Sequence, residues 1–387
     1  ITKNKNFPTD QNLYPGDYII DIAKQIIKSK KIIDFNNFEK IYKKLSADSL
    51  KYSIKLIKKN LLSLGIDHDI FVYETNLVNK KLVNKTINKL QKQKYAYYGV
   101  LKAPKGEVSE NWKPRNQLLF NSTKFGDDTD RALKKIDGSW TYFANDIAYH
   151  SHKVDRKFTK LINVLGSDHA GYIKRITAAT NAISNNKTEL FCKVTQLVKL
   201  LKNGQPYKMS KRAGEFISAQ DLLDEVEKDP IRFMMLNRSN DVELDFDFDK
   251  VKEKNKDNPV FYVQYAYARI NSILRSLKIK FTNKVELNDK DFQLNEIEQK
   301  ILRKIFEWPK IIESACNKFD LHKIPVYLYD LATLFHSYWS KGNEDEKYKF
   351  ISDEKIKRNE IFAIMNLTAI VLQNGMGILG VSLPDKM

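Results

Sequence analysis

The chain has 387 residues, of which 42% are hydrophobic and 29% are charged. These values are typical of a globular protein with a sizeable core, and they exclude a chain that is disordered throughout. The length allows two or three domains, and the net charge of +18 favours an anionic partner such as a nucleic acid, a nucleotide or an acidic membrane.

The alternative explanation of this charge is a lysine-rich composition with no such partner, because the lysines are spread along the chain. Residues 1–100 carry a net charge of +10, and residues 251–387 carry +4. If a basic surface meets an anion, the first hundred residues therefore contribute most of it.

The two cysteines, Cys192 and Cys316, lie far apart, and neither belongs to a C-x-x-C pattern or a Cys/His cluster. A structural zinc site is not expected, and both thiols are predicted to be buried in a protein of a reducing compartment. No apolar run is expected to reach membrane-spanning length, and no signal peptide is visible. We therefore expect a cytoplasmic protein without a membrane partner.

The first hundred residues combine amphipathic helices with short strands. Gly65 is a plausible C-cap for the second helix, because glycine adopts the left-handed conformation that ends many helices. The expected elements are a helix from Asp17, a helix over 46–64, a strand over 71–73, a very basic helix over 77–93 and a strand over 95–101.

From residue 117 the pattern changes to alternating strands and helices. Asp137-Gly138 predicts a hairpin turn, and a helix is expected from Tyr142 through His150. An apolar strand over 161–165 ends at Gly166, a helix follows over 172–183, and a second strand-rich run covers 191–201. This order predicts a parallel α/β sheet. Gly166 then lies at the carboxyl end of its strand, where open α/β sheets bind ligands.

A lysine-rich segment, Lys208-Met209-Ser210-Lys211-Arg212, follows the turn-forming residues 203–206. Two ammonium groups on a loop suit a polyphosphate, because lysine is a movable point charge that can follow developing charge. The other interpretation is a solvated basic turn, and the five residues alone do not separate the two.

Beyond residue 251 the chain is predicted to be all-helical. Asn258-Pro259 begins a helix, and further helices are expected near 293–315, 320–339 and 354–374. Aromatic residues in this part could stack on nucleic-acid bases, but at helical spacing they more often belong to a core. The candidates are Tyr262, Tyr265, Tyr267, Tyr327, Tyr329, Tyr338 and Trp339.

Several separated motifs together resemble the arginyl-tRNA synthetases of class I, in the right order and over nearly the whole chain. The motifs are Phe125-Gly126-Asp127-Asp128, the run 137–150, Gly166-Ser167-Asp168-His169-Ala170-Gly171-Tyr172, the lysine-rich segment 208–212, the run 257–266, the segment 321–343 and the terminal Met387.

The resemblance implies the second half of a Rossmann-like class I catalytic domain with an inserted region, followed by a helical-bundle anticodon-binding domain. The fold class is thus α/β plus all-α. The expected domains are a connecting or inserted region over 1–115, the second half of the catalytic domain over 116–251 and the anticodon-binding domain over 252–387.

One departure from the family concerns a His-x-Gly-His motif of the first catalytic half. The histidines stand at positions 68, 150, 152, 169, 322 and 336, and none makes that spacing. We therefore expect the chain to be the carboxyl-terminal portion of a longer protein and inactive alone.

The family's reaction implies ATP with Mg²⁺, L-arginine and tRNA as partners, with no metal site in the protein, and we expect a monomer. Lys208, Ser210 and Lys211 are the candidate catalytic residues, and the candidate ATP-binding residues are Gly166, Asp168, His169 and Met209. His169 could equally be a satisfied histidine without a ligand. His150 and His152 are interpreted as surface residues.

Tyr142 and Asp146 are the candidate arginine-binding residues. A carboxylate matches the planar guanidinium bidentately, and spacing of four places both side chains on one helix face. The alternative is an ordinary Tyr/Asp helix pair. Two other functions stay open: a non-catalytic tRNA-binding fragment, and a class I synthetase for another amino acid.

Overall fold

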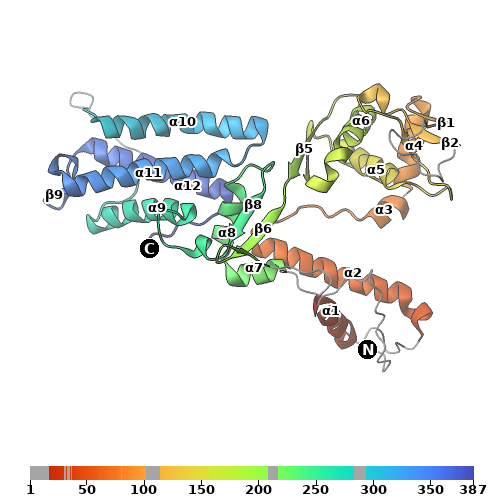
Figure 1. Ribbon diagram of the computed structural model, residues 1–387, viewed down its shortest axis with the longest axis horizontal. Helices are drawn as coiled ribbons and strands as arrows, with labels where there is room; N and C mark the ends of the chain where they lie inside the picture. Colours follow the sequence, from red (N-terminus) through yellow and green to blue (C-terminus); the bar gives the residue numbers. More distant parts are fainter. Residues whose placement is uncertain are drawn as a thin grey trace. The chain divides into compact units, whose positions relative to one another are not determined.

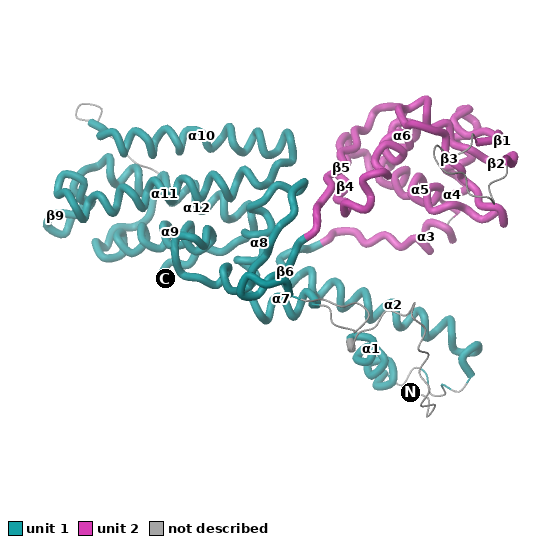
Figure 2. The backbone as a smooth tube through the Cα atoms, viewed as in Figure 1, with its two compact units in different colours: residues 1–67, 198–387 teal, residues 68–197 magenta. Residues whose placement is uncertain are grey.

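The computed structural model describes residues 17–29, 32, 35, 37–79, 81–101, 114–207, 217–282 and 293–387. The chain forms two compact units (Figure 2). Unit 2 is the continuous segment 68–197, and unit 1 combines residues 1–67 with 198–387.

Unit 2 consists of helices around two small sheets (Figure 1). Its elements are α3 (Glu74–Asn79), α4 (Leu82–Lys92), β1 (Ala96–Val100), β2 (Asn116–Phe120), η1 (Thr123–Phe125), β3 (Arg131–Ala132), α5 (Tyr142–Asp155), β4 (Lys160–Gly166), η2 (Ser167–Tyr172), α6 (Ile173–Ser184) and β5 (Glu189–Thr195).

The first half of unit 2 packs α4 against the antiparallel sheet β1–β2–β3. Val83, Ile87 and Leu90 lie on the buried face of α4 and join the same core as Phe120. The predicted helix over 77–93 is in fact two helices, α3 and α4. The predicted strand over 71–73 is wrong, because that stretch has no regular structure. The expected turn at Asp137-Gly138 is present, with Gly138 at a φ of +80°.

The second half of unit 2 is a β–α–β crossover. Strands β4 and β5 pair in parallel from Lys160↔Glu189 to Gly166↔Thr195, with α6 between them in sequence. The predicted parallel sheet is therefore confirmed. Because both strands end together at Gly166 and Thr195, the polar residues that follow Gly166 emerge at the carboxyl edge of the sheet.

Unit 1 begins with two helices and continues, after unit 2, with a small mixed sheet and a helical bundle. Its elements are α1 (Asp17–Lys28), α2 (Phe38–Ser63), β6 (Val198–Lys202), β7 (Gln205–Pro206), α7 (Ala219–Glu225), α8 (Lys228–Leu236), β8 (Leu244–Asp247), η3 (Lys250–Lys252), α9 (Pro259–Ser276), α10 (Glu296–Lys318), α11 (Lys323–Glu344), η4 (Glu346–Tyr348), β9 (Ile351–Ser352), β10 (Lys355–Ile356) and α12 (Asn359–Leu379).

Helix α2 is longer than the sequence indicates, since it begins at Phe38, where Asn37 caps it, and not near residue 46. It ends as predicted: Gly65 has a φ of +72°, and the N–H of Ile66 donates to the Leu61 carbonyl, as in a Schellman motif.

The strand-rich run 191–201 divides into two strands, β5 in unit 2 and β6 in unit 1. β6 pairs in parallel with β8 and antiparallel with β7.

The bundle α9–α12 holds the largest core of the chain. Its helices correspond to those predicted after residue 251. Tyr327 and Tyr338 are buried in it, so these two aromatic residues are core residues and do not face a nucleic acid. Cys316, expected to be buried, is exposed, and Cys192 is half-buried.

Among the described helices, α12 has the length and composition to cross a membrane, contrary to the expectation from the sequence. Its side chains are mostly buried between the other helices of the bundle. An apolar helix enclosed by amphipathic ones is what the core of a helical domain requires.

Arg232 of α8 joins the ends of two distant helices. Its guanidinium donates to the carbonyl of Leu379, at the end of α12, over 2.7 Å, and to the carbonyl of Leu64, after α2, over 2.9 Å. Because the last carbonyls of a helix lack partners within it, a half-buried arginine that donates to both helix ends fixes the positions of α2 and α12.

The contact between α11 and α12 requires a glycine. A Cβ built on Gly375 would lie 2.5 Å from Cδ2 of the fully buried Leu328. We expect Gly375→Ala to lower the free energy of unfolding by about 1–3 kcal/mol through overpacking. Gly377→Ala is the matched control, because a Cβ there meets nothing within 4 Å. Its higher helix propensity should leave stability unchanged or raise it by up to about 1 kcal/mol. Thermal unfolding measures both, and equal effects would contradict this packing.

Candidate functional site

Helix α5 begins at Tyr142 because Thr141 caps it: the Thr141 hydroxyl accepts from the N–H of Ala144 over 3.2 Å. The helix buries Phe143, Ala144 and Ile147 in the core of unit 2. Tyr142 and Asp146 lie four residues apart and share the other face. Tyr142 is 77% exposed, and Asp146 is half-buried.

The hydroxyl of Tyr172 donates a hydrogen bond to Oδ2 of Asp146. Burial, and then this bond, raise the pKa of Tyr172, so the phenol remains a donor at neutral pH. No described residue forms a hydrogen bond with Oδ1 of Asp146. The carboxylate is therefore held by one oxygen and presents the other.

His150 is buried, at 4% exposure, and the prediction of a surface histidine is wrong. Its Nδ1 lies 2.8 Å from the Asp146 carbonyl oxygen, and its Nε2 lies 2.9 Å from Nδ2 of Asn163. Lys153 donates to Oδ1 of Asn163 over 2.9 Å. An ammonium can only donate, so the Asn163 amide donates to Nε2, and the proton on Nδ1 of His150 is donated to the carbonyl.

Burial, with a smaller contribution from the charge of Lys153, lowers the pKa of His150 to about 4. Burial also lowers the pKa of Lys153, whose ammonium lies 4.4 Å from the ring centroid of Tyr149. His150 is thus neutral at physiological pH. The chain Lys153–Asn163–His150 holds the backbone carbonyl of Asp146, while Tyr172 holds its carboxylate.

Gly166 is the last residue of β4, and Asp168 follows in η2. A Cβ on Gly166 would lie 2.6 Å from Oδ1 of Asp168, so the glycine leaves room for this carboxylate. The side chains of Asp168 and His169 are 79% and 58% exposed, and they face each other at 3.5 Å. Both predicted ATP-binding side chains therefore reach solvent at the carboxyl edge of β4.

The motif at 125–128 has a structural role in unit 2. Arg131 donates to both carboxylate oxygens of Asp127, each over 2.7 Å, and Ser122 donates to Oδ2. Burial alone would raise the pKa of Asp127, but these donors outweigh it and lower the pKa to about 2. Asp127 is therefore a permanent anion that fixes the loop after β2.

The lysine-rich residues Lys208, Met209, Ser210 and Lys211 lie outside the described residues, but the segments on both sides are described. The turn between β6 and β7 is held by Asp247, whose Oδ2 accepts from the N–H of Gly204 over 2.9 Å. Burial would raise the pKa of Asp247, and backbone donors, among them Gly204, lower it instead. After the segment, Ser218 and Asp221 form a capping box at the start of α7.

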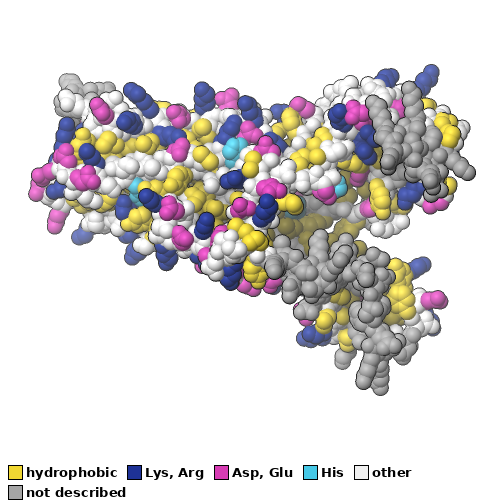
Figure 3. All heavy atoms as spheres, viewed as in Figure 1, with side chains coloured by type: hydrophobic (Ala, Val, Ile, Leu, Met, Phe, Trp, Pro, Cys, Tyr) yellow, Lys and Arg dark blue, Asp and Glu magenta, His cyan; other side chains and the backbone are white. Residues whose placement is uncertain are grey.

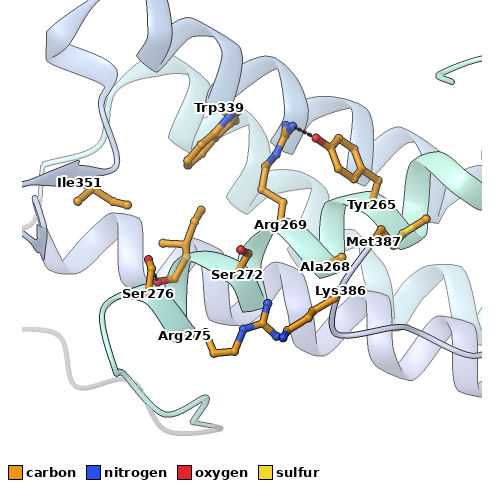
Figure 4. A pocket seen from close by; sticks show the side chains of 11 residues that line it. Tyr265, Ala268, Arg269, Ser272, Arg275, Ser276, Trp339, Ile351, Lys386 and Met387 are labelled. Carbon is orange, nitrogen blue, oxygen red and sulfur yellow. Dashed lines mark hydrogen bonds between the residues drawn. The ribbon is translucent and has the colours of Figure 1, made fainter. Parts of the chain in front are cut away.

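The helical bundle of unit 1 has a separate pocket of about 600 Å³ with a mixed polar and apolar lining (Figure 4). Arg269 lies between two aromatic rings, 4.4 Å from the ring centroid of Tyr265 and 5.4 Å from that of Trp339. It donates to the Tyr265 hydroxyl over 2.5 Å. The C-terminal residues Lys386 and Met387 form another part of the wall. The pocket therefore combines cations with aromatic faces.

Four of the residues around Asp146 were not predicted as site residues: Tyr172, His150, Lys153 and Asn163. Of these four, only Asn163 could have been recognised from the sequence, because it is a polar residue in the middle of the apolar strand over 161–165. Tyr172 belonged to a recognised motif but was given no role.

Two family models match the chain. One is described as "tRNA synthetases class I (R), catalytic domain" and matches residues 110–274, and the other is described as "DALR anticodon binding domain" and matches residues 263–387. The predicted fold class, a class I catalytic domain followed by a helical anticodon-binding domain, is confirmed.

Relatives of the chain carry the name arginine–tRNA ligase. The protein of Pelagibacter ubique is 54% identical over all of this chain and 67% of its own length. The protein of Roseobacter denitrificans is 42% identical over 97% of this chain and 65% of its own length. The chain thus spans about two thirds of the length of these curated relatives.

Solved structures give the same result. A crystal structure from Campylobacter jejuni, described as an arginyl-tRNA synthetase, covers the whole chain with a TM-score of 0.82 and 30% identity, over 78% of its own length. The Thermus thermophilus arginyl-tRNA synthetase matches 95% of this chain, and 69% of its own, with a TM-score of 0.67 at 16% identity, which shows a shared fold.

The buried His150 predicts how stability depends on pH. Its folded-state pKa of about 4 lies below the ordinary 6.5, so between these values the unfolded chain binds more protons than the folded one. Stability from this group is complete above pH 6.5 and falls as the pH decreases to 4, by on the order of 3 kcal/mol.

Unfolding of the unmodified chain and of His150→Gln, measured from pH 7.5 to 4, tests this dependence. The variant should be less stable at pH 7 and should lose less stability on acidification. His336 of the bundle, whose pKa burial also lowers to about 4, is unchanged in both proteins and cancels in the comparison. Parallel pH curves would contradict the assignment.

Proposed function

This chain belongs to the class I arginyl-tRNA synthetases, and on that premise we propose that it carries the arginine-recognition and lysine-loop parts of an arginine–tRNA ligase. Asp146, a half-buried carboxylate with one oxygen held by Tyr172, is the observation on which the proposal rests most. The substrates are ATP with its Mg²⁺, L-arginine and tRNA.

The face of α5 with Tyr142 and Asp146 suits a guanidinium. A carboxylate and a guanidinium form charge-assisted hydrogen bonds, and Oδ1 of Asp146 is available for one of them. The ring of Tyr142 already holds one cation, because Nζ of Lys135 lies 5.3 Å from its centroid. Cation–π attraction of the same kind would hold the substrate side chain.

ATP is proposed to bind where β4 ends. The backbone of Gly166 allows close approach of the nucleotide, and Asp168 accepts from ribose hydroxyls. His169 and Met209 are proposed to contact the nucleotide as well. Lys208, Ser210 and Lys211 then donate to the phosphates from the loop that begins after β7.

The proposed chemistry has two steps. The α-carboxylate of arginine attacks the α-phosphorus of ATP, and the bond to pyrophosphate breaks, which leaves arginyl-adenylate. A ribose hydroxyl of the terminal adenosine of tRNA then attacks the arginyl carbonyl, and AMP leaves. Charge develops on the α-phosphate and pyrophosphate in the first step, where positioned cations such as Lys208 and Lys211 lower the barrier.

The bundle α9–α12 is proposed to bind the anticodon arm. The pocket around Arg269 offers cations for phosphates and the faces of Tyr265 and Trp339 for bases. The domain limits proposed from the sequence, at residues 115 and 251, stay part of this proposal. So do a monomeric state, a cytoplasmic location and the absence of a membrane partner.

The sequence contains no His-x-Gly-His motif. We propose that catalysis needs the family segment with that motif, so the chain of 387 residues alone does not catalyse ATP–pyrophosphate exchange. The alternatives are a tRNA-binding chain without catalysis and a synthetase for another amino acid. Exchange with arginine and tRNA, measured on this chain and on the product of the complete coding sequence, separates them. Exchange by this chain alone would contradict the need for the motif.

Asp146→Asn tests the recognition of arginine. The amide keeps the acceptor for Tyr172 but loses the charge. In the protein expressed from the complete coding sequence, the KM for arginine in exchange should therefore rise about 100-fold, the loss expected for a charge-assisted pair. The KM for ATP should change little. Asp155→Asn, an exposed site with the same change of charge on the same helix, is the control. An arginine KM within threefold of the unmodified protein would exclude the assigned role.

Lys211→Ala tests the role of the loop. In the protein expressed from the complete coding sequence, we expect the rate of adenylate formation to fall at least 100-fold, because a cation that stabilises the transition state is lost. Affinity for tRNA should be unchanged. Lys199→Ala serves as control, since this exposed lysine of β6 pairs with Glu243 outside the loop. Equal losses of activation and of tRNA affinity would count against the assignment.

A further inference from the structure

Helices α4 and α5 of unit 2 lie side by side (Figure 1). Their side chains line a groove of about 670 Å³. We call it the α4 groove. One wall comes from α4 with the residue that precedes it, and the other comes from the second half of α5. The groove is lined by Lys81, Leu82, Asn84, Lys85, Thr86, Asn88, Lys89, Lys92, Ala148, Ser151, His152 and Asp155.

The charge of the α4 groove is strongly positive. Its four lysines follow one another at intervals of four, four and three residues, which places them on one helix face over about 16 Å. All four are exposed, and none forms an ion pair with a described residue. The one acidic side chain of the lining is Asp155. The four lysines are Lys81, Lys85, Lys89 and Lys92.

On the face of the molecule in Figure 3, lysines and arginines are interspersed with acidic side chains. In the α4 groove, four unpaired ammonium groups meet one carboxylate. Like charges this close repel one another, so the arrangement is stabilised when an anion occupies the groove.

Neutral polar groups accompany the lysines. Asn84 and Asn88 are exposed on α4, and Ser151 lies on α5. The Nδ1 atom of His152 is buried and has no hydrogen-bond partner within the described part of the chain. Amide, hydroxyl and imidazole groups are the usual partners of phosphate and sugar oxygens.

The other face of α4 argues against a membrane as the occupant. Val83, Ile87 and Leu90 are 0–1% exposed and belong to the core of unit 2. An amphipathic helix that lies in a membrane inserts its apolar face, and here that face is buried in the core of unit 2. A concave basic groove with neutral donors fits a nucleic-acid strand instead.

We propose that the α4 groove binds the sugar–phosphate backbone of tRNA, as a contact separate from the pocket around Arg269. The inference rests on the proposed function only for the identity of the RNA. Because the lysines are point charges and no Phe, Tyr or Trp lines the groove, the contact is insensitive to sequence. It contributes affinity for any tRNA, and recognition of the arginine acceptor comes from elsewhere.

The test replaces all four lysines of the α4 groove by glutamine and measures Kd for an arginine-accepting tRNA transcript between 50 and 300 mM salt. Loss of phosphate contacts should weaken binding at least 10-fold at 100 mM salt and flatten the slope of log Kd against log salt by about 2 or more. A second, non-cognate tRNA should lose affinity by the same factor.

The matched control removes four exposed lysines from α2, with the same change in net charge: Lys43, Lys51, Lys55 and Lys59 to glutamine. It should leave the slope within about 0.5 of the unmodified chain. Equal flattening in both proteins would show that net charge, and not the groove, determines binding, and would overturn the proposal. Circular dichroism of each variant checks that the helices persist, and Lys85→Glu is a single substitution that repeats the test if the quadruple variant is misfolded.

The outcomes separate this inference from the proposed function. If the groove variant binds tRNA with an unchanged slope while arginine-dependent exchange by the complete protein proceeds, the groove assignment is wrong and the function stands. If no exchange occurs with arginine but the groove variant loses its salt dependence, the groove binds RNA and the proposed function fails. Absence of tRNA binding by the unmodified chain would overturn the groove proposal.

Discussion

The hydrogen bond from Tyr172 to Asp146 is the constraint on which the site of unit 2 depends. It joins a helix that begins at Tyr142 to the turn that follows β4, and so brings together two motifs more than twenty residues apart. The neutral His150 holds the backbone of Asp146 from another side. Between these two contacts the carboxylate is immobilised before any substrate binds, which lowers the entropy cost of recognising a guanidinium.

A second constraint organises unit 1, where α8 acts as a clamp. Arg232 fixes the ends of α2 and α12, and the carboxylate of Asp229 accepts from the N–H of Ser382 over 3.0 Å. Arg275 donates to the Asp385 carbonyl over 3.0 Å. The C-terminal tail is thereby held against α9, where its last residues complete the wall of the Arg269 pocket. The same contacts therefore affect both the packing of the bundle and the shape of that pocket.

Much of the fold was predictable, because helices and the β4–α6–β5 crossover follow from local periodicity. The glycine at 166 and the pair Tyr142/Asp146 were also identified from the sequence, and their proposed ligands remain predictions. The sequence alone could not predict burial that depends on contacts with segments distant along the chain. His150 lies on a helix near lysines, so the sequence predicts an exposed side chain. In the structure it is buried, and its Nε2 is hydrogen-bonded to Asn163 of β4, thirteen residues further along the chain. The start of α2 was missed because its apolar signal is weak: Ile41 and Leu45 pack against the small core around Ile22 and Ile26 but stay half-buried, and no residue of α2 is fully buried.

The central claim is that Asp146 is a preorganised partner for a guanidinium. The direct measurement is the Kd of L-arginine and of L-citrulline, its uncharged isostere, for the protein expressed from its complete coding sequence. A charge-assisted pair predicts that arginine binds at least about 100-fold more tightly. Equal affinities for the two amino acids, or tighter binding of citrulline, would contradict the account.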